Sequence, residues 1–223
     1  QVRGIAVLRG QADRHRGGLD LFVPALRSLS LEVPLSDLAA SVLGSLVPDL
    51  PALIGRRISE APALSTPAAR LRLLLTLEHV LLRADQPRLL LFEDIHWARP
   101  DSIELLRRLS GQVRGHPVLI VATYRDEERA GLVSELAGAQ RLKLSRLDGE
   151  ALGELIDSML GAVPRRRQLV DLLLRESEGN SFFVVEVMRT LAEQSGGLSQ
   201  IGQHELPTAV FAGGVREALR RRL

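Results

Sequence analysis

Residues 88–94, with the sequence Arg-Leu-Leu-Leu-Phe-Glu-Asp, decide the fold. The run from Leu89 to Phe92 is apolar without interruption, which is typical of a strand buried within a parallel sheet. Two carboxylates, Glu93 and Asp94, follow the run directly. Because ligands bind at the carboxyl ends of the strands in open parallel sheets, we expect these two side chains to belong to a functional site.

A second apolar run, residues 117–122, follows an amphipathic stretch at 100–109. Two strands joined by a helix predict a β-α-β unit, whose parallel strands are covered by helices on both faces. The apolar run at 4–10 predicts another strand, and residues 141–144 are a candidate for one more. The sequence therefore predicts an α/β fold, in line with 45% hydrophobic but only 3% aromatic residues.

Helical spacing of apolar residues predicts the elements before this region. Two helices between residues 22 and 46 are separated by Pro34. A third helix has Thr66 as its expected N-cap and runs to about Arg83. Its expected inner face carries Leu71, Leu74, Leu75 and Leu82.

The pattern becomes wholly helical after Asp148, a suitable N-cap. Helices are expected at about 150–160, 165–176 and 182–194. We therefore expect a sheet-containing domain at 1–147 and a helical domain at 148–223.

The composition excludes several classes of function. The chain has no cysteine, which excludes disulfides, thiolate catalysis and cysteine-ligated zinc, and its five histidines form no close pair at metal-ligand spacing. The net charge is only +2, and the basic runs at 165–167 and 220–222 are typical of solvated helix ends, so we do not expect direct nucleic-acid binding. The longest apolar stretch, 71–82, is too short to span a bilayer, and we expect a cytoplasmic location.

Glu93 and Asp94 are suited to holding Mg²⁺ and activating water. Mg²⁺ keeps most of its waters and takes one or two carboxylates besides the phosphates of its substrate. One acid can hold the metal shell while the other orients the attacking water, and the pattern does not decide which acid has which role. An acidic pair at a strand end also occurs as a simple cap or turn.

A family resemblance is carried by the residues after the acidic pair, Ile95-His96-Trp97-Ala98-Arg99-Pro100-Asp101-Ser102 and then Glu104-Leu105-Leu106. With Glu93 and Asp94 they resemble the signature DDLHWADPSSLELL of the STAND class. These are signal-transduction ATPases found in large LuxR-type transcriptional regulators and cyclase-linked ATPases. The resemblance implies that Glu93 occupies the Walker B acid position and Asp94 the second acid. Arg99 departs from the pattern, since the family usually has Asp there.

The end of the second strand, residues 121–127, resembles the TYRxxE segment that lies beside Walker B in the same class. The resemblance implies a nucleotide-site position for Thr123 and a sensor role for Arg125, at the same sheet edge as Asp94. An arginine there can donate two hydrogen bonds to a γ-phosphate and report hydrolysis through their loss. The alternative is a salt bridge from Arg125 to one of the acids at 126–128.

Residues 178–186 resemble the EGNPFFVEEL segment in the helical lid of the class, where a turn approaches the nucleotide. The resemblance implies nucleotide contacts at Gly179, Asn180 and Ser181. Gly179 allows close backbone approach, and Asn180 tolerates left-handed geometry. Ser181 stands where the family has proline, and its alternative role is the N-cap of the following helix.

No stretch of the sequence matches Gly-x-x-x-x-Gly-Lys-Ser/Thr, the loop that surrounds nucleotide phosphates. In the STAND class this loop comes just before the strand expected at 4–10. The expected fold is therefore a P-loop NTPase sheet without its first strand and phosphate loop, followed by a helical lid. Residues 206–219 resemble the start of a winged-helix domain.

The resemblance implies an ATP-binding and ATP-hydrolysing regulatory module of a signal-transduction or transcriptional regulator, with ATP and Mg²⁺ as ligands. Its expected partners are other domains of the same polypeptide, namely the upstream phosphate loop and the downstream winged-helix and output domains; self-association is left open. The alternative is a degenerate, non-hydrolysing scaffold for protein–protein interaction, favoured by Arg99, Ser181 and the missing loop. Without that loop, we expect this chain alone to bind nucleotide weakly.

Overall fold

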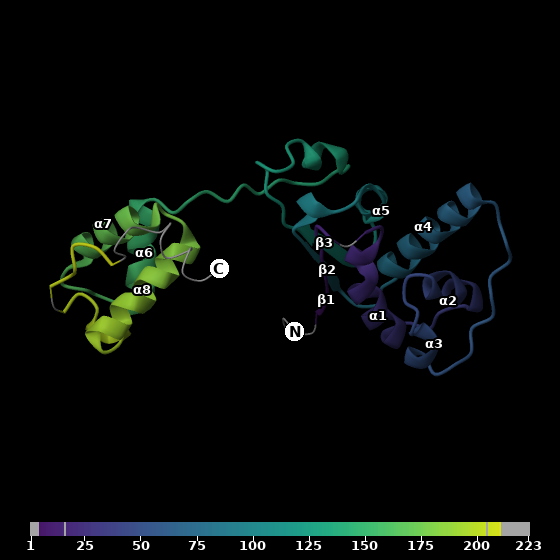
Figure 1. Ribbon diagram of the computed structural model, residues 1–223, viewed down its shortest axis with the longest axis horizontal. Helices are drawn as coiled ribbons and strands as arrows, with labels where there is room; N and C mark the ends of the chain where they lie inside the picture. The colour runs from purple at the N-terminus through teal and green to yellow at the C-terminus, as the bar shows by residue number, and fades with distance from the viewer. Residues whose placement is uncertain (1–4, 16, 204, 211–223) are drawn as a thin grey trace. The chain divides into compact units, whose positions relative to one another are not determined.

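The computed structural model describes residues 5–15, 17–203 and 205–210. The chain divides into two compact units, residues 1–141 and 142–223 (Figure 1). Whether these units correspond to the domains expected at 1–147 and 148–223 stays a prediction. The predicted winged-helix start beyond residue 210 and the basic run at 220–222 lie outside the described residues.

The first unit is built on a three-stranded parallel sheet in the order β1-β2-β3. Its strands are β1 (Ala6–Gln11), β2 (Arg88–Glu93) and β3 (Val118–Ala122). The α/β fold and the strands expected near 4–10, 88–92 and 117–122 are thus confirmed. Because all three strands run in the same direction, the acidic end of β2 and the end of β3 lie at one edge of the sheet.

Helices connect and cover these strands. Their bounds are η1 (Asp20–Phe22), α1 (Val23–Glu32), α2 (Asp37–Gly44), α3 (Leu50–Leu53), α4 (Thr66–Leu82), η2 (Ile95–Trp97), α5 (Pro100–Gln112) and η3 (Leu132–Glu135). The two helices expected around Pro34 are confirmed as α1 and α2. The N-cap expected at Thr66 is wrong by one residue, because Ser65 has the extended backbone of the cap and Thr66 is already helical.

The expected inner face of α4 is only half right. Leu74 and Leu82 are buried, but Leu71 and Leu75 are 51% and 47% exposed. The helix buries Leu77 and Leu81 in their place. Leucine occurs on nearly every side of this helix, so its apolar spacing does not single out one face.

Among the described residues, helices cover only one of the two faces of the sheet. This corrects the expectation of helices on both faces. Leu8, Leu90 and Phe92 point into the core, whereas Leu119 on the opposite face is 62% exposed. Figure 1 shows α1, α4 and α5 to one side of the strands. Both connections move along the sheet in the same direction, and right-handed crossovers in one direction place their helices on one face.

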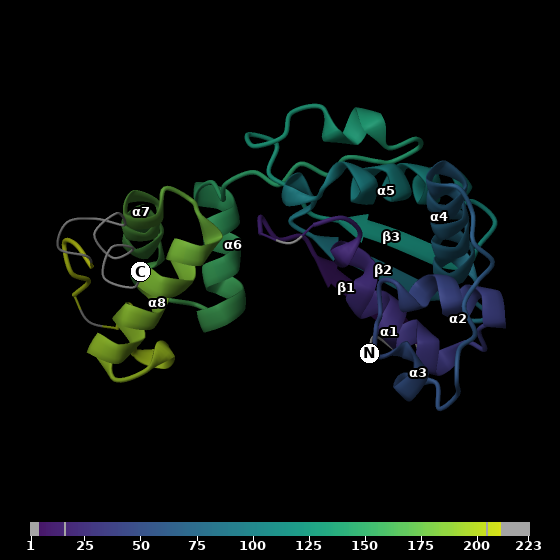
Figure 2. The same cartoon turned by 45° about the vertical axis from the view of Figure 1, so that its right-hand side comes forward.

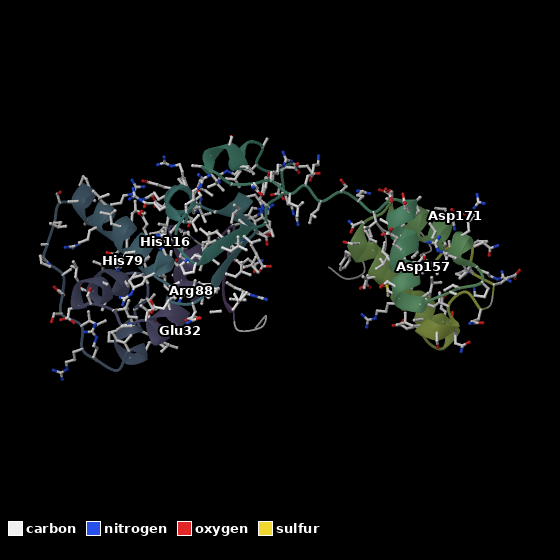
Figure 3. All side chains as sticks on the ribbon, turned by 180° about the vertical axis from the view of Figure 1, so that it is seen from behind. Glu32, His79, Arg88, His116, Asp157 and Asp171 are labelled. Carbon is white, nitrogen blue, oxygen red and sulfur yellow. The ribbon has the colours of Figure 1, made fainter. Side chains whose placement is uncertain are left out.

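The start of β2 is fixed by a buried arginine. Arg88 Nη1 donates to the Arg83 carbonyl over 2.7 Å, and its Nη2 lies 3.6 Å from Glu32 Oε2 on α1. Figure 3 labels Arg88 and Glu32, which lie close together in the first unit. This anchor holds β2 at the end opposite to Glu93 and Asp94.

The strand proposed at 141–144 does not form. Residues 139–148 have no regular secondary structure, and Leu142 and Leu144 are each 85% exposed. Alternating leucines therefore give this segment the composition of a strand, but no neighbouring strand pairs with it among the described residues.

The second unit packs three helices and a short turn: α6 (Gly149–Leu160), α7 (Arg166–Ser177), α8 (Ser181–Ser195) and η4 (Leu198–Gln200) (Figure 2). All three predicted helices are confirmed. Asp148 is the N-cap of α6, since its carboxylate accepts a hydrogen bond from the Ala151 amide over 2.9 Å. Leu152, Leu173 and Val187 supply one core side chain from each helix. No helix in the described ranges is both long and apolar enough to cross a membrane.

Candidate functional site

Asp94 lies directly after β2 in a left-handed backbone conformation, with φ of 55°. Its amide donates to Thr123 Oγ1 over 3.2 Å, and one carboxylate oxygen accepts from Gln11 Nε2 over 2.9 Å. The next amide, of Ile95, donates to the Thr123 carbonyl over 2.9 Å. The ends of all three strands therefore hold this acid in place, and Thr123 contributes to the turn.

Glu93 is the last residue of β2 and pairs in register with Gln11 of β1. Its carbonyl accepts from the Ala12 amide over 2.9 Å, which extends the β1–β2 pairing past the end of the strands. The alternation along β2 places Phe92 in the core and Glu93 on the face that the helices leave open. Its half-buried carboxylate is thus available to a ligand at this sheet edge.

Glu93 and Asp94 are the two carboxylates at the end of β2 that could hold a metal. Among the described residues, no group of three or more histidine or acidic side chains could hold an ion. The donor set fits Mg²⁺, which binds through one or two carboxylates together with waters and phosphate oxygens. It does not fit zinc, whose sites need three or four protein ligands.

Arg125 follows β3 at the same edge and forms the salt bridge given above as the alternative to a phosphate contact. Its Nη1 donates to Glu128 Oε1 over 3.2 Å, and its amide donates to Nδ1 of His96 over 3.3 Å. The guanidinium is 61% exposed, so on its own this bridge contributes little to stability.

Glu128 accepts hydrogen bonds from other donors besides Arg125. The sequence predicted no role for Glu128 beyond the bridge with Arg125. Its Oε2 accepts from Trp97 Nε1 over 2.9 Å and from Arg14 Nη2 over 3.0 Å. The Arg14 guanidinium also stacks 4.7 Å from the centroid of the Trp97 ring. Arg14, His96, Trp97, Arg125 and Glu128 thus form one cluster, which we call the Glu128 cluster.

The surroundings of Glu128 favour its charged form. The hydrogen bond from Trp97, and then the electrostatic interactions with His96, Arg14 and Arg125, hold the pKa of Glu128 below its ordinary value of 4.5. Partial burial acts in the opposite direction and is outweighed.

Acid is expected to break these contacts and change the environment of Trp97. Because the folded-state pKa is lowered, the stabilisation by Glu128 is complete above the ordinary value of 4.5 and is lost as the pH falls through the lowered value. Trp97 is the only tryptophan, so its emission reports the change directly. The transition below pH 4.5 is expected to disappear in Glu128→Gln; a variant that keeps it would show that another group causes it.

The turn at 178–181 belongs to the second unit and is described there by itself. Glu178 and Gly179 have positive φ, 49° and 74°, whereas Asn180 has φ of −75°. Asn180, not Ser181, caps α8, because its side-chain oxygen accepts from the Phe182 amide over 3.0 Å. Asn180 does not adopt the left-handed geometry that it tolerates, and the capping role considered for Ser181 is wrong.

A local contact accounts for Gly179. Its carbonyl accepts from the Leu147 amide over 2.8 Å, and a Cβ at Gly179 would lie 2.1 Å from the Leu147 carbonyl oxygen. Glycine is thus needed here for packing, whether or not a ligand approaches. The nucleotide contacts expected at Gly179, Asn180 and Ser181 stay predictions.

The first unit also contains a surface cavity of about 420 Å³, which lies away from the strand ends. Most of its lining residues belong to α2 and α4, and they include the polar side chains of Arg70 and Arg72; Asp101 of α5 lines it as well. None of the residues discussed at the strand ends lines it. The candidate site is therefore the sheet edge formed by Glu93, Asp94 and Arg125.

Comparisons with known proteins give the family of the chain. No curated protein matches the chain. Among solved structures, a RuvB variant from Thermotoga maritima is similar at 16% identity, over 85% of this chain and 70% of that one, with a TM-score of 0.41. A family model described as "AAA ATPase domain" matches residues 1–121, more than half of the 223 residues. The chain therefore belongs to the AAA ATPase domain family.

Proposed function

We propose that this chain is the metal-site and sensor part of an Mg²⁺-dependent ATPase module of the STAND class, working within a signal-transduction or transcriptional regulator. The observation that carries the proposal is the position of Glu93, Asp94 and Arg125 at the carboxyl ends of neighbouring parallel strands. The signature from Asp94 to Ser102 and membership of the AAA ATPase domain family support it.

The roles follow from the positions of these side chains. Glu93 and Asp94 would hold Mg²⁺ and orient the attacking water between them. Bound Mg²⁺ would neutralise the charge that develops on the phosphates during transfer. Gln11 and Thr123 keep Asp94 in place, so the acid needs little reorganisation when a nucleotide arrives. Arg125 would supply a cation at the same edge.

The phosphate-binding loop would come from a segment outside residues 1–223, and the turn at 178–181 would approach the nucleotide from the helical unit. Further partners would be the winged-helix and output domains of the same polypeptide. These relations follow from the STAND resemblance and complete the proposed module.

A non-hydrolysing interaction scaffold is the second candidate. The observation that favours it is the open face of the sheet, where Leu119 and Val121 are 62% and 39% exposed. In a scaffold, Glu93 and Asp94 would only terminate β2.

Nucleotide binding separates the two candidates. Without the three charge-assisted phosphate contacts of a loop, worth about 1.5–3 kcal/mol each, ATP affinity is expected to fall by roughly a thousandfold or more. Calorimetry should therefore show only weak binding of Mg-ATP to the 223-residue chain. A polypeptide in which a Gly-x-x-x-x-Gly-Lys-Ser/Thr segment precedes this chain should bind and slowly hydrolyse ATP.

Micromolar ATP binding by the 223-residue chain alone would contradict the proposed dependence on that loop. A polypeptide with an intact loop that neither binds nor hydrolyses ATP would favour the scaffold.

A further inference from the structure

Four nitrogen donors converge on the carboxylate of Glu128. Arg14 Nη2 and Trp97 Nε1 donate to Oε2 over 3.0 and 2.9 Å, and Arg125 Nη1 donates to Oε1 over 3.2 Å. The fourth donor is Nε2 of His96, which lies 3.8 Å from Oε1. That last distance is too long for a hydrogen bond.

His96 is therefore the unsatisfied member of the cluster. Its side chain is fully buried, and Nε2 has no hydrogen-bond partner among the described residues. Because Nδ1 accepts the amide proton of Arg125, a neutral His96 carries its own proton on Nε2. A buried donor without a partner is costly, and Nε2 lies 3.8 Å from the carboxylate that the other donors bind, so an acceptor for it is missing at this place.

The geometry suits an anion with more oxygens than a carboxylate has. Oε2 of Glu128 accepts from two donors and Oε1 from the third, and Oε1 stays 3.8 Å from His96 Nε2, beyond hydrogen-bond distance. A tetrahedral oxyanion has four oxygens and can satisfy donors that arrive from different directions. The two arginines add the positive charge that a phosphate requires.

We propose that Glu128 is an intramolecular occupant of a phosphate site formed by Arg14, His96, Trp97 and Arg125, and that inorganic phosphate binds there when Glu128 leaves. Glu128 then competes with phosphate for the site. The apparent phosphate affinity is the intrinsic affinity multiplied by the fraction of molecules in which Glu128 has left the site. The site does not depend on the proposed ATPase activity. Only the assignment of a nucleotide's terminal phosphate as its natural source rests on that function.

The cluster is arranged so that removing the competitor should leave the donors in place. The backbone of Arg125 is tied to the His96 ring, and the Arg14 guanidinium rests over the Trp97 ring. Glu128 is a surface side chain with a third of its area exposed, so replacing it should not disturb the core.

The emission of Trp97 provides the test, since it is the only tryptophan and lies in the site. The chain is titrated with inorganic phosphate at constant ionic strength. If Glu128 occupies the site about nine-tenths of the time, Glu128→Ala should bind phosphate about tenfold more tightly than the wild type. Glu128→Gln, which keeps the shape but loses the charge, should also bind more tightly. Adding Arg14→Gln to Glu128→Ala should remove the gain.

Glu127→Ala is the matched control, because it removes the same charge from the neighbouring position without touching the cluster. Its phosphate affinity should equal that of the wild type. If Glu128→Ala and Glu128→Gln bind phosphate no more tightly than Glu127→Ala, the proposal is overturned. An equal gain in all three variants would also overturn it, since a general charge effect would then suffice.

Competition identifies the source of the phosphate. In a polypeptide that carries a phosphate-binding loop, inorganic phosphate that weakens ATP binding but not ADP binding points to the terminal phosphate of the nucleotide. Phosphate binding that leaves the affinities for ATP and ADP unchanged points to free phosphate as the ligand. Either of these two outcomes supports the phosphate site. Failure of ATP hydrolysis leaves the phosphate titration measurable, so the two proposals fail separately.

Discussion

Replacing Gly179 by alanine is expected to destabilise the second unit by about 3 kcal/mol, because two penalties add at this position. The residue has φ of +74°, and a Cβ would lie 2.1 Å from the Leu147 carbonyl oxygen. The left-handed backbone alone costs an alanine about 1 kcal/mol. The collision adds about 1–3 kcal/mol, since a backbone atom cannot rotate out of the way as a side chain can.

Hydrogen exchange resolved by peptide fragments would measure this loss unit by unit. Amides of α6, α7 and α8 should exchange faster in Gly179→Ala. The thermal unfolding of the first unit, followed by the emission of Trp97, should have the same midpoint as in the wild type. Gly196→Ala is the matched control, since Gly196 also has a positive φ, +84°, but a Cβ there would meet nothing within 4 Å. It should cost only about 1 kcal/mol. Equal losses in the two variants would show that the contact with Leu147 is unimportant.

The strands and most helices were predictable because their signals are local. Residues 89–92 and 118–121 are apolar without interruption, and Asp148 is followed at once by the amphipathic α6. The cap at α8 was missed by one residue, because Asn180 and Ser181 are both good N-caps and only the backbone geometry separates them.

Coverage of the sheet was not predictable from periodicity. An apolar strand signals burial, yet Leu119 and Val121 of β3 are exposed. Which face a helix covers depends on strand order and crossover handedness, and neither appears in the sequence pattern. The exposed leucines at 142 and 144 are a second example in which the sequence pattern was not sufficient. A segment with the composition of a strand forms a strand only when another strand pairs with it.

The acidic pair and Arg125 were predictable, whereas most of their partners were not. Glu93, Asp94 and Arg125 follow apolar runs, and parallel strands bring those ends together. Gln11 contacts Asp94 across 83 residues, and Arg14 contacts Glu128 across 114 residues. Such contacts have no local signal. Only the bridge from Arg125 to Glu128, three residues away, lay within reach of the sequence.

Glu93→Gln and Asp94→Asn are expected to slow ATP turnover strongly while leaving nucleotide binding almost intact. Both changes keep the shape and remove the charge that Mg²⁺ and the attacking water need. Asparagine tolerates left-handed backbone well, so Asp94→Asn can keep the φ of 55° and the contact with Gln11. In a polypeptide that carries the phosphate-binding loop, kcat should fall roughly a hundredfold or more.

The Mg²⁺ dependence of the two variants would assign their separate roles. Loss of the metal ligand should raise the Mg²⁺ concentration needed for half-maximal rate, whereas loss of the water-orienting acid should lower kcat without that shift. Asp101→Asn, which removes a charge of α5 that pairs with Arg70 of α4, should retain full turnover. If Glu93→Gln and Asp94→Asn also retain it, the edge of β2 is not the catalytic site, and the scaffold with its open sheet face becomes the better account of this fold.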